Sequence, residues 1–70
     1  MVVFVNTKNN TDALRAINIA KTTLKNDGYR NEKEKQYYLK QLRHYNSLIK
    51  KVMDAKSKGL QVRKLAFTFY

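Results

Sequence analysis

His44 is the only histidine in a 70-residue chain that has no cysteine, so few side chains are available for acid–base or nucleophilic chemistry. A catalytic histidine needs a nucleophile or an orienting carboxylate, and the local sequence places no acidic residue beside His44. The five acidic residues stand near expected helix ends, where capping and the helix dipole account for most of them. We therefore expect a protein that is not an enzyme.

Metal and nucleotide chemistry find no support either. One histidine and no cysteine cannot supply the usual ligands of a zinc site. The chain also lacks the glycine-rich phosphate loop and the acidic calcium loop. We expect no metal ion and no cofactor.

Positive charge dominates the composition. Fifteen Lys and Arg against five Asp and Glu give a formal net charge of +10, which favours a polyanionic partner, either DNA or RNA or an acidic protein. Eleven of the fifteen are Lys, a flexible point charge suited to phosphates, whereas the reading of base edges prefers Arg. Any nucleic-acid binding is therefore expected to be non-specific.

Six basic residues recur on one side of the second of two expected helices. At ~100° per residue they lie opposite an apolar seam, and a stripe of this kind can follow a phosphate backbone. A lysine-rich stripe is also common on an ordinary solvated helix face. The predicted nucleic-acid contacts are Lys33, Lys40, Arg43, Lys50, Lys51 and Lys58.

Two helices are expected to carry these residues. Apolar residues at three- and four-residue spacing predict the first over 11–27, capped by Asn10 or Thr11 and stopped by Gly28. Within it Ile19 stands nearly opposite the apolar side, where it could touch the sheet or a second subunit.

The second helix is predicted over 31–58. Asn31 followed by Glu34 resembles a capping box, and Gly59 ends the helix. Its apolar seam is Tyr38, Leu42, Tyr45, Ile49 and Val52, flanked by Leu48 and Met53. Tyr37 and His44, on one flank, could stack on bases but are more often half-buried boundary residues.

Strand patterns flank the helices. A short β-branched and aromatic run predicts a strand over 2–6, and alternation near the C-terminal end predicts another over 61–70. Because a helical hairpin reverses direction once, the two strands should pair antiparallel beneath it. The sequence thus predicts one α+β domain over 1–70, of order β-α-α-β, with a central antiparallel helical hairpin on a two-stranded antiparallel sheet.

A two-stranded sheet has two open edges and is marginal alone. The later strand carries neither charge nor proline from Leu65 onward, so it could extend the sheet across a homodimer or accept a strand of another protein. Terminal strands simply wrapped against the helices are the alternative. The predicted interface residues are Leu65, Phe67, Phe69 and Tyr70.

Two functional hypotheses are favoured over a third, a membrane-surface role for the amphipathic second helix. One is non-specific contact with a nucleic-acid backbone through the basic stripe. The other is a protein-interaction module, for instance a small phage-type modulator of a host protein. No apolar run reaches the ~18 residues of a membrane span, and the first residues lack the charged region of a signal peptide, so we expect a cytoplasmic protein that does not enter a membrane.

Overall fold

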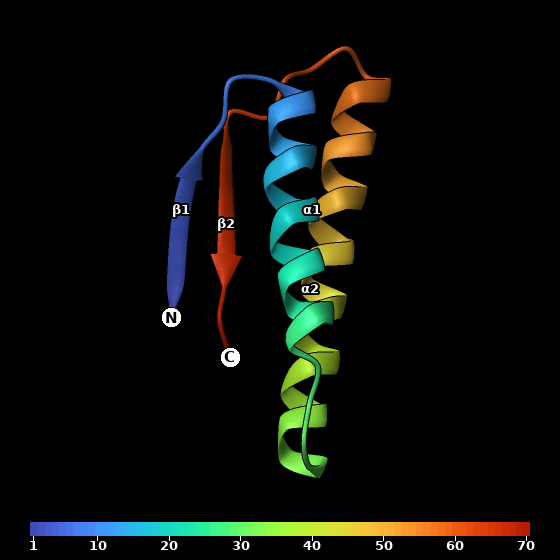
Figure 1. The fold of residues 1–70 in the computed structure, drawn as a ribbon. Coiled ribbons are helices and arrows are strands. Elements are labelled where there is room, and N and C mark those ends of the chain that lie inside the picture. The colour runs from blue at the N-terminus through green and yellow to red at the C-terminus, as the bar shows by residue number, and fades with distance from the viewer.

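The computed structural model describes residues 1–70 and contains β1 (Val2–Asn6), α1 (Asn10–Asp27), α2 (Glu32–Ser57) and β2 (Lys64–Thr68). The expected α+β fold of order β-α-α-β is confirmed. Figure 1 shows the two helices side by side as an antiparallel hairpin, with the sheet along one flank. In that sheet β2 lies next to the helices and β1 lies on the outside.

The start of α1 lies one residue earlier than predicted. Asn9 is the N-cap, because its side-chain Oδ1 accepts a 2.9 Å hydrogen bond from the N–H of Asp12. Gly28 ends the helix as expected, at φ 63°, and its N–H donates to the carbonyl of Leu24 at 3.0 Å.

Asn10, one of the two predicted caps, instead fastens the loop that leads into β2. Its side chain is buried, and its Oδ1 accepts from the N–H of Val62 at 2.8 Å. Its Nδ2 donates to the carbonyl of Leu60 at 2.7 Å, and its own N–H donates to Gln61 Oε1 at 2.9 Å. These three bonds join the start of α1 to the segment that follows α2.

Both ends of α2 follow the sequence signals closely. Asn31 Oδ1 accepts from the N–H of Glu34 at 2.9 Å. The Glu34 carboxylate accepts from the side-chain amide of Asn31 at 3.0 Å, rather than from its backbone N–H as in the usual capping box. At the other end Gly59 has φ 73°, and Leu60 N–H reaches back to the carbonyl of Ala55 at 2.9 Å.

The sheet is antiparallel, with Val3 opposite Phe67 and Val5 opposite Leu65. The later strand is shorter than the predicted 61–70, because residues 60–62 are bound to Asn10 instead of continuing the ladder. Leu65 and Phe67 point toward the helices and are buried, while Ala66 and Thr68 alternate to the other face.

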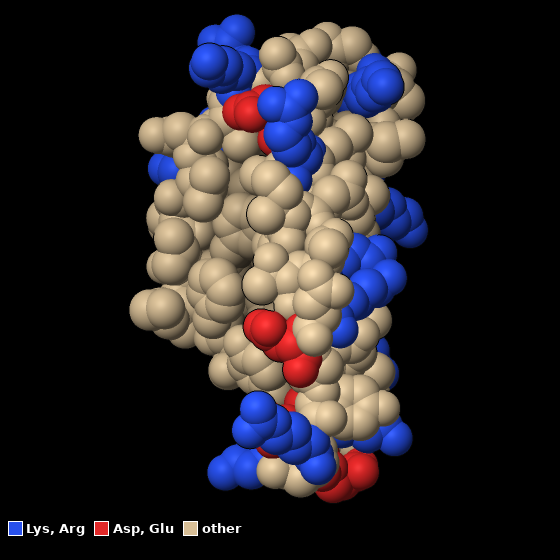
Figure 2. All heavy atoms as spheres, in the orientation of Figure 1, with Lys and Arg blue, Asp and Glu red and all other residues tan.

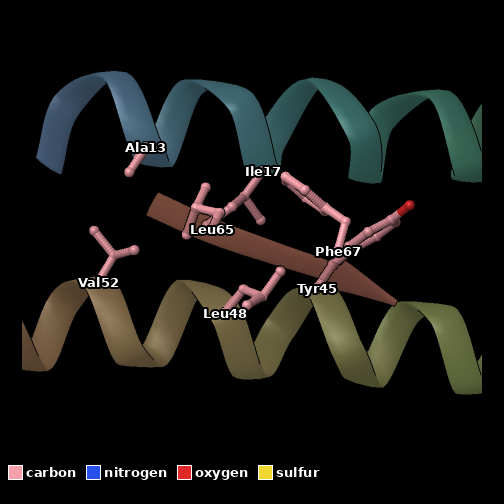
Figure 3. Close-up of a cluster of buried hydrophobic side chains, with 7 residues drawn as sticks. All are labelled: Ala13, Ile17, Tyr45, Leu48, Val52, Leu65 and Phe67. Atoms are coloured by element: carbon pink, nitrogen blue, oxygen red, sulfur yellow. The ribbon is translucent and has the colours of Figure 1, made fainter. Parts of the chain in front are cut away.

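The core lies where β2 runs along the groove between the helices (Figure 3). Its buried apolar residues are Ala13 and Ile17 of α1, Tyr45, Leu48 and Val52 of α2, and Leu65 and Phe67 of β2. The buried side of α2 is therefore turned toward β2 relative to the predicted seam. Leu48 is in the core, whereas Tyr38 is half-buried against Tyr29 and Met53 is exposed.

Neither helix contains an apolar stretch of the length and hydropathy that would cross a bilayer.

Candidate functional site

The six predicted basic residues all have exposed side chains on α2 or at its C-cap. Since Tyr45, Leu48 and Val52 turn one side of α2 into the core, the basic residues lie on its exposed sides, with Lys51 next to β2. Figure 2 shows Lys and Arg along the margin where α2 lies and at both ends of the molecule, and few of them over the middle of the front face.

The centre of this surface is a shallow depression of about 400 Å³ lined by Lys40, Arg43, His44, Ser47 and Tyr70. Lys40 Nζ lies 6.0 Å from the ring centroid of Tyr70, within cation–π range. The Tyr70 ring meets the His44 imidazole edge-on, with 6.3 Å between their centroids. An exposed aromatic ring thus lies among basic side chains.

A groove between α2 and β2 continues from this depression, since His44 lines both. Lys51 stands on its α2 wall and Lys64 on its β2 wall. The basic surface therefore extends from the helix onto the strand. We define the basic surface as Lys40, Arg43, Lys50, Lys51 and Lys64, with Tyr70 beside Lys40 at one end.

Two side chains of α2 hold the end of β2 in place by hydrogen bonds to the backbone of a single residue, Thr68. Thr68 N–H donates to His44 Nε2 at 3.0 Å, and the Thr68 carbonyl accepts from Gln41 Nε2 at 2.8 Å. Gln41 is only 1% exposed, and its Oε1 has no hydrogen-bond partner. These bonds place the end of β2, and with it Tyr70, beside Lys40.

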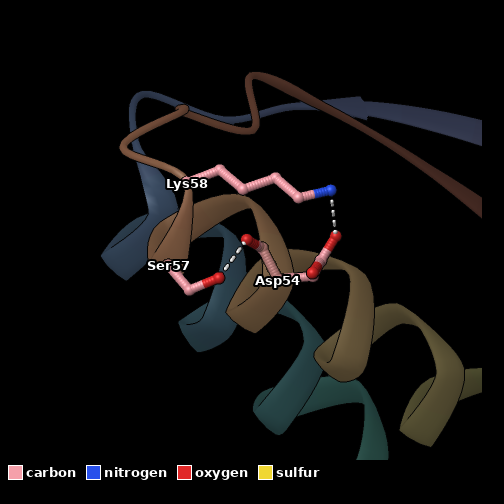
Figure 4. Close-up of polar contacts among 3 residues, drawn as sticks. All are labelled: Asp54, Ser57 and Lys58. Carbon is pink, nitrogen blue, oxygen red and sulfur yellow. Dashed lines mark hydrogen bonds and ion pairs between the residues drawn. The ribbon is translucent and has the colours of Figure 1, made fainter.

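The six predicted basic residues differ in whether an acidic residue lies near them. Lys58 Nζ lies 3.1 Å from Asp54 Oδ2 (Figure 4), and this is the chain's one ion pair within 4.0 Å. Lys33, Lys40, Arg43, Lys50 and Lys51 have no carboxylate partner at that distance, and Lys33 is flanked in sequence by Glu32 and Glu34 at the far end of α2. The four residues in the middle of the helix therefore have neither an ion-pair partner nor an acidic residue next to them in sequence.

The predicted protein-interface residues differ in their exposure to solvent. Leu65 and Phe67 are buried in the monomer core, so their side chains cannot meet a partner, because β2 turns this face toward the helices. Phe69 is half-buried, and Tyr70 is 59% exposed beside Lys40 rather than on a free sheet edge. The outer edge of β2 is itself partly closed, since His44 and Gln41 occupy both backbone groups of Thr68.

Lys64 is not part of the predicted basic stripe, and Tyr70 is predicted at a strand interface, whereas it lies beside Lys40. Lys64 precedes Leu65 in the alternation, so a strand with Leu65 inward puts Lys64 on the opposite face; that signal was present in the sequence. No feature of the sequence predicts that Tyr70 lies close to Lys40. Tyr37 lies apart from His44, in a depression shared with Thr23 and Phe69.

No group of three His, Cys, Asp or Glu side chains lies close enough together to hold a metal ion. His44 Nε2 is engaged by the backbone of β2. No protein family, no curated protein and no solved structure shows a significant match to this chain.

Proposed function

We propose that the chain is a non-enzymatic binding protein whose basic surface contacts the phosphate backbone of DNA or RNA without sequence specificity. The observation that carries the proposal is the set of cations without ion-pair partners on one surface of α2 and β2, with the exposed ring of Tyr70 beside Lys40. Each phosphate that such a surface neutralises releases counterions, which supplies the free energy of binding.

The dimensions of the surface fit this role. Lys40 and Lys51 are separated by about 16 Å along α2 at the rise of ~1.5 Å per residue. A strand of duplex DNA presents one phosphate per ~3.4 Å of helix axis, so this length runs beside about five phosphates. Tyr70 offers a π-face at the Lys40 end of the surface, and aromatic stacking is tolerant of base identity.

The composition of the surface argues against sequence reading. Arg43 is its only guanidinium, and bidentate contacts to guanine are made chiefly by Arg. Lysine ammonium groups on flexible stems follow phosphates as point charges instead. We therefore expect similar affinity for duplexes of unrelated sequence.

The test is fluorescence anisotropy with labelled duplex DNA and RNA across a salt series. The triple variant Lys40→Glu, Arg43→Glu, Lys51→Glu should bind at least about tenfold more weakly, and its slope of log K against log salt should flatten by about 2 to 3. A matched control is Lys8→Glu, Lys25→Glu, Arg30→Glu, which makes the same charge change at exposed positions outside the basic surface.

Equal loss in both triple variants would mean that only net charge matters and would refute a defined surface. No binding by the unmodified protein at low salt would refute the proposal and favour an acidic protein as the partner of the same surface.

A further inference from the structure

The outer edge of β1 is the unprotected edge of the sheet. Met1 and Phe69 exchange both backbone hydrogen bonds, and Thr7 N–H donates to the carbonyl of Arg63, so the odd-numbered residues of β1 bond to β2. By alternation the N–H and C=O groups of Val2, Phe4 and Asn6 point outward. No side chain caps them, in contrast to Thr68 on β2.

An apolar surface adjoins this edge on both faces of the strand. On the face away from the helices Phe4 is 62% exposed and Val2 is also exposed. On the helix side an open groove between β1 and α1 is lined only by apolar residues: Val5, Ala16, Ile19, Ala20, Phe67 and Phe69. Ile19 remains 61% exposed there because β1 has no second strand beyond it.

Apart from Lys64, charge separates this surface from the basic surface. Residues 2–7 contain no charged side chain, in a chain of net charge +10. The nearest strand cation is Lys64, whose Nζ lies over the Phe4 ring at 4.6 Å from its centroid. A nucleic acid or an acidic protein is attracted to α2 and not to this edge, which instead fits an uncharged, apolar strand.

We infer that the occupant is a second copy of this chain, whose β1 pairs antiparallel with the first. The outward groups allow a two-fold arrangement centred on Phe4, in which Phe4 exchanges both bonds with Phe4 of the second copy. Val2 then lies opposite Asn6 of the second copy, and the reverse. None of the paired residues carries a charged side chain, and the marginal two-stranded sheet becomes a four-stranded one.

This pairing also closes the apolar groove. A two-fold axis perpendicular to the sheet leaves both helical hairpins on one side of it, so the two α1 helices face each other across the axis. Val3 and Val5, which point to the helix side, lie opposite each other in the two copies. The Ile19 side chains turn toward the shared groove, while Lys40 and Arg43 of both basic surfaces stay outside the interface.

Cysteine cross-linking tests the register, because the chain has no native cysteine. Hydrogen-bonded residues opposite each other have Cα atoms ~5.5 Å apart, which a disulfide can span. Phe4→Cys should therefore give covalent dimers under mild oxidation. Val2→Cys alone should not, whereas an equal mixture of Val2→Cys and Asn6→Cys should. Efficient cross-linking of Val2→Cys alone, or none with Phe4→Cys and the mixture, would overturn the register.

Sedimentation equilibrium tests the association without cysteines. The unmodified chain should be a dimer, and Phe4→Lys should be a folded monomer because two like charges meet at the axis. Phe4→Pro should also be monomeric, since it removes only an outward N–H of an edge strand. Asn26→Lys adds the same charge at the far end of α1 and should remain dimeric.

Added salt should strengthen the dimer by screening the repulsion between two basic copies, whereas it weakens nucleic-acid binding. A monomeric unmodified chain at high concentration, or a dimer that survives both Phe4 substitutions, would refute the inference. Neither result depends on nucleic acid, so each proposal can fail separately.

Discussion

Thr68 on β2 donates its backbone N–H to the imidazole of His44 on α2 at 3.0 Å, so a helix side chain takes the place that another strand would occupy. Gln41, one turn earlier on α2, completes the contact by donating to the Thr68 carbonyl. An exposed strand edge invites pairing with other chains, and these side chains close part of it. The relationship explains why β1, and not β2, is the edge available for association.

Replacing His44 by Phe should release the Thr68 amide while keeping a ring against Tyr70. We expect a loss of about 1 kcal/mol in the free energy of unfolding and faster hydrogen exchange at Thr68. Ala66, whose N–H also points outward but has no such partner, is the internal control and should exchange fast in both proteins. Unchanged protection of Thr68 would contradict the bond.

Replacing Gln41 by Glu should be strongly destabilising, because a buried carboxylate would face the Thr68 carbonyl without a donor. We expect a loss of about 3 kcal/mol at neutral pH. Burial raises the pKa of a carboxyl group, and the protonated form regains an O–H donor. The penalty should therefore shrink as pH falls through the raised folded-state pKa.

The matched control for that variant is Gln61→Glu. Gln61 is exposed, and its Oε1 already accepts from the N–H of Asn10, a role that a carboxylate fulfils equally well. Chemical unfolding of both variants across a pH series is the measurement. If Gln41→Glu and Gln61→Glu had equal stabilities that did not change with pH, the side chain at position 41 would not be buried as the structure shows.

The element order and helix bounds could be predicted because they rest on local signals. Asn31 with Glu34, Gly28 and Gly59 mark their helix ends whatever the tertiary context. The contacts of Asn10 and Tyr70 could not be predicted, because each is made with a segment far along the chain. Leu65 and Phe67 show the intermediate case, since alternation implies one covered face but does not tell which surface covers it.

Asn10→Ala should destabilise the fold more than Asn9→Ala, although the residues are adjacent. Asn9 contributes a helix cap, worth about 1 kcal/mol. The buried side chain of Asn10 makes two bonds to residues 60 and 62, so its removal should cost about 2 to 3 kcal/mol. Thermal unfolding resolves the difference at about 4–8 °C per kcal/mol. If Asn9→Ala were the more destabilising change, that result would contradict the hydrogen bonds that join Asn10 to residues 60 and 62.

Lys64→Glu should weaken nucleic-acid binding although Lys64 lies on a strand, because it forms one wall of the groove below α2. We expect about a three- to tenfold loss and a slope in log salt that is flatter by at least about 1. Arg63→Glu makes the same charge change at the adjacent exposed residue, which precedes β2 and does not line the groove. Equal effects would place the binding surface on α2 alone.

Asp54→Asn should strengthen nucleic-acid binding. The Asp54 carboxylate is the one acidic group within the basic stripe and holds Lys58 at 3.1 Å, which reduces the charge that Lys58 can offer to a phosphate. Its negative charge also lies near the C-terminal end of α2, where the helix dipole disfavours it, so the variant should be no less stable. Both groups are exposed, so the ion pair itself contributes little to stability.

We expect about a two- to fivefold gain in affinity for Asp54→Asn. Lys58→Ala should lower the affinity more in the Asp54→Asn background than in the unmodified chain. Anisotropy titrations of these variants measure both effects, and an unchanged affinity for Asp54→Asn would show that the phosphates lie closer to Lys40 than to Lys58.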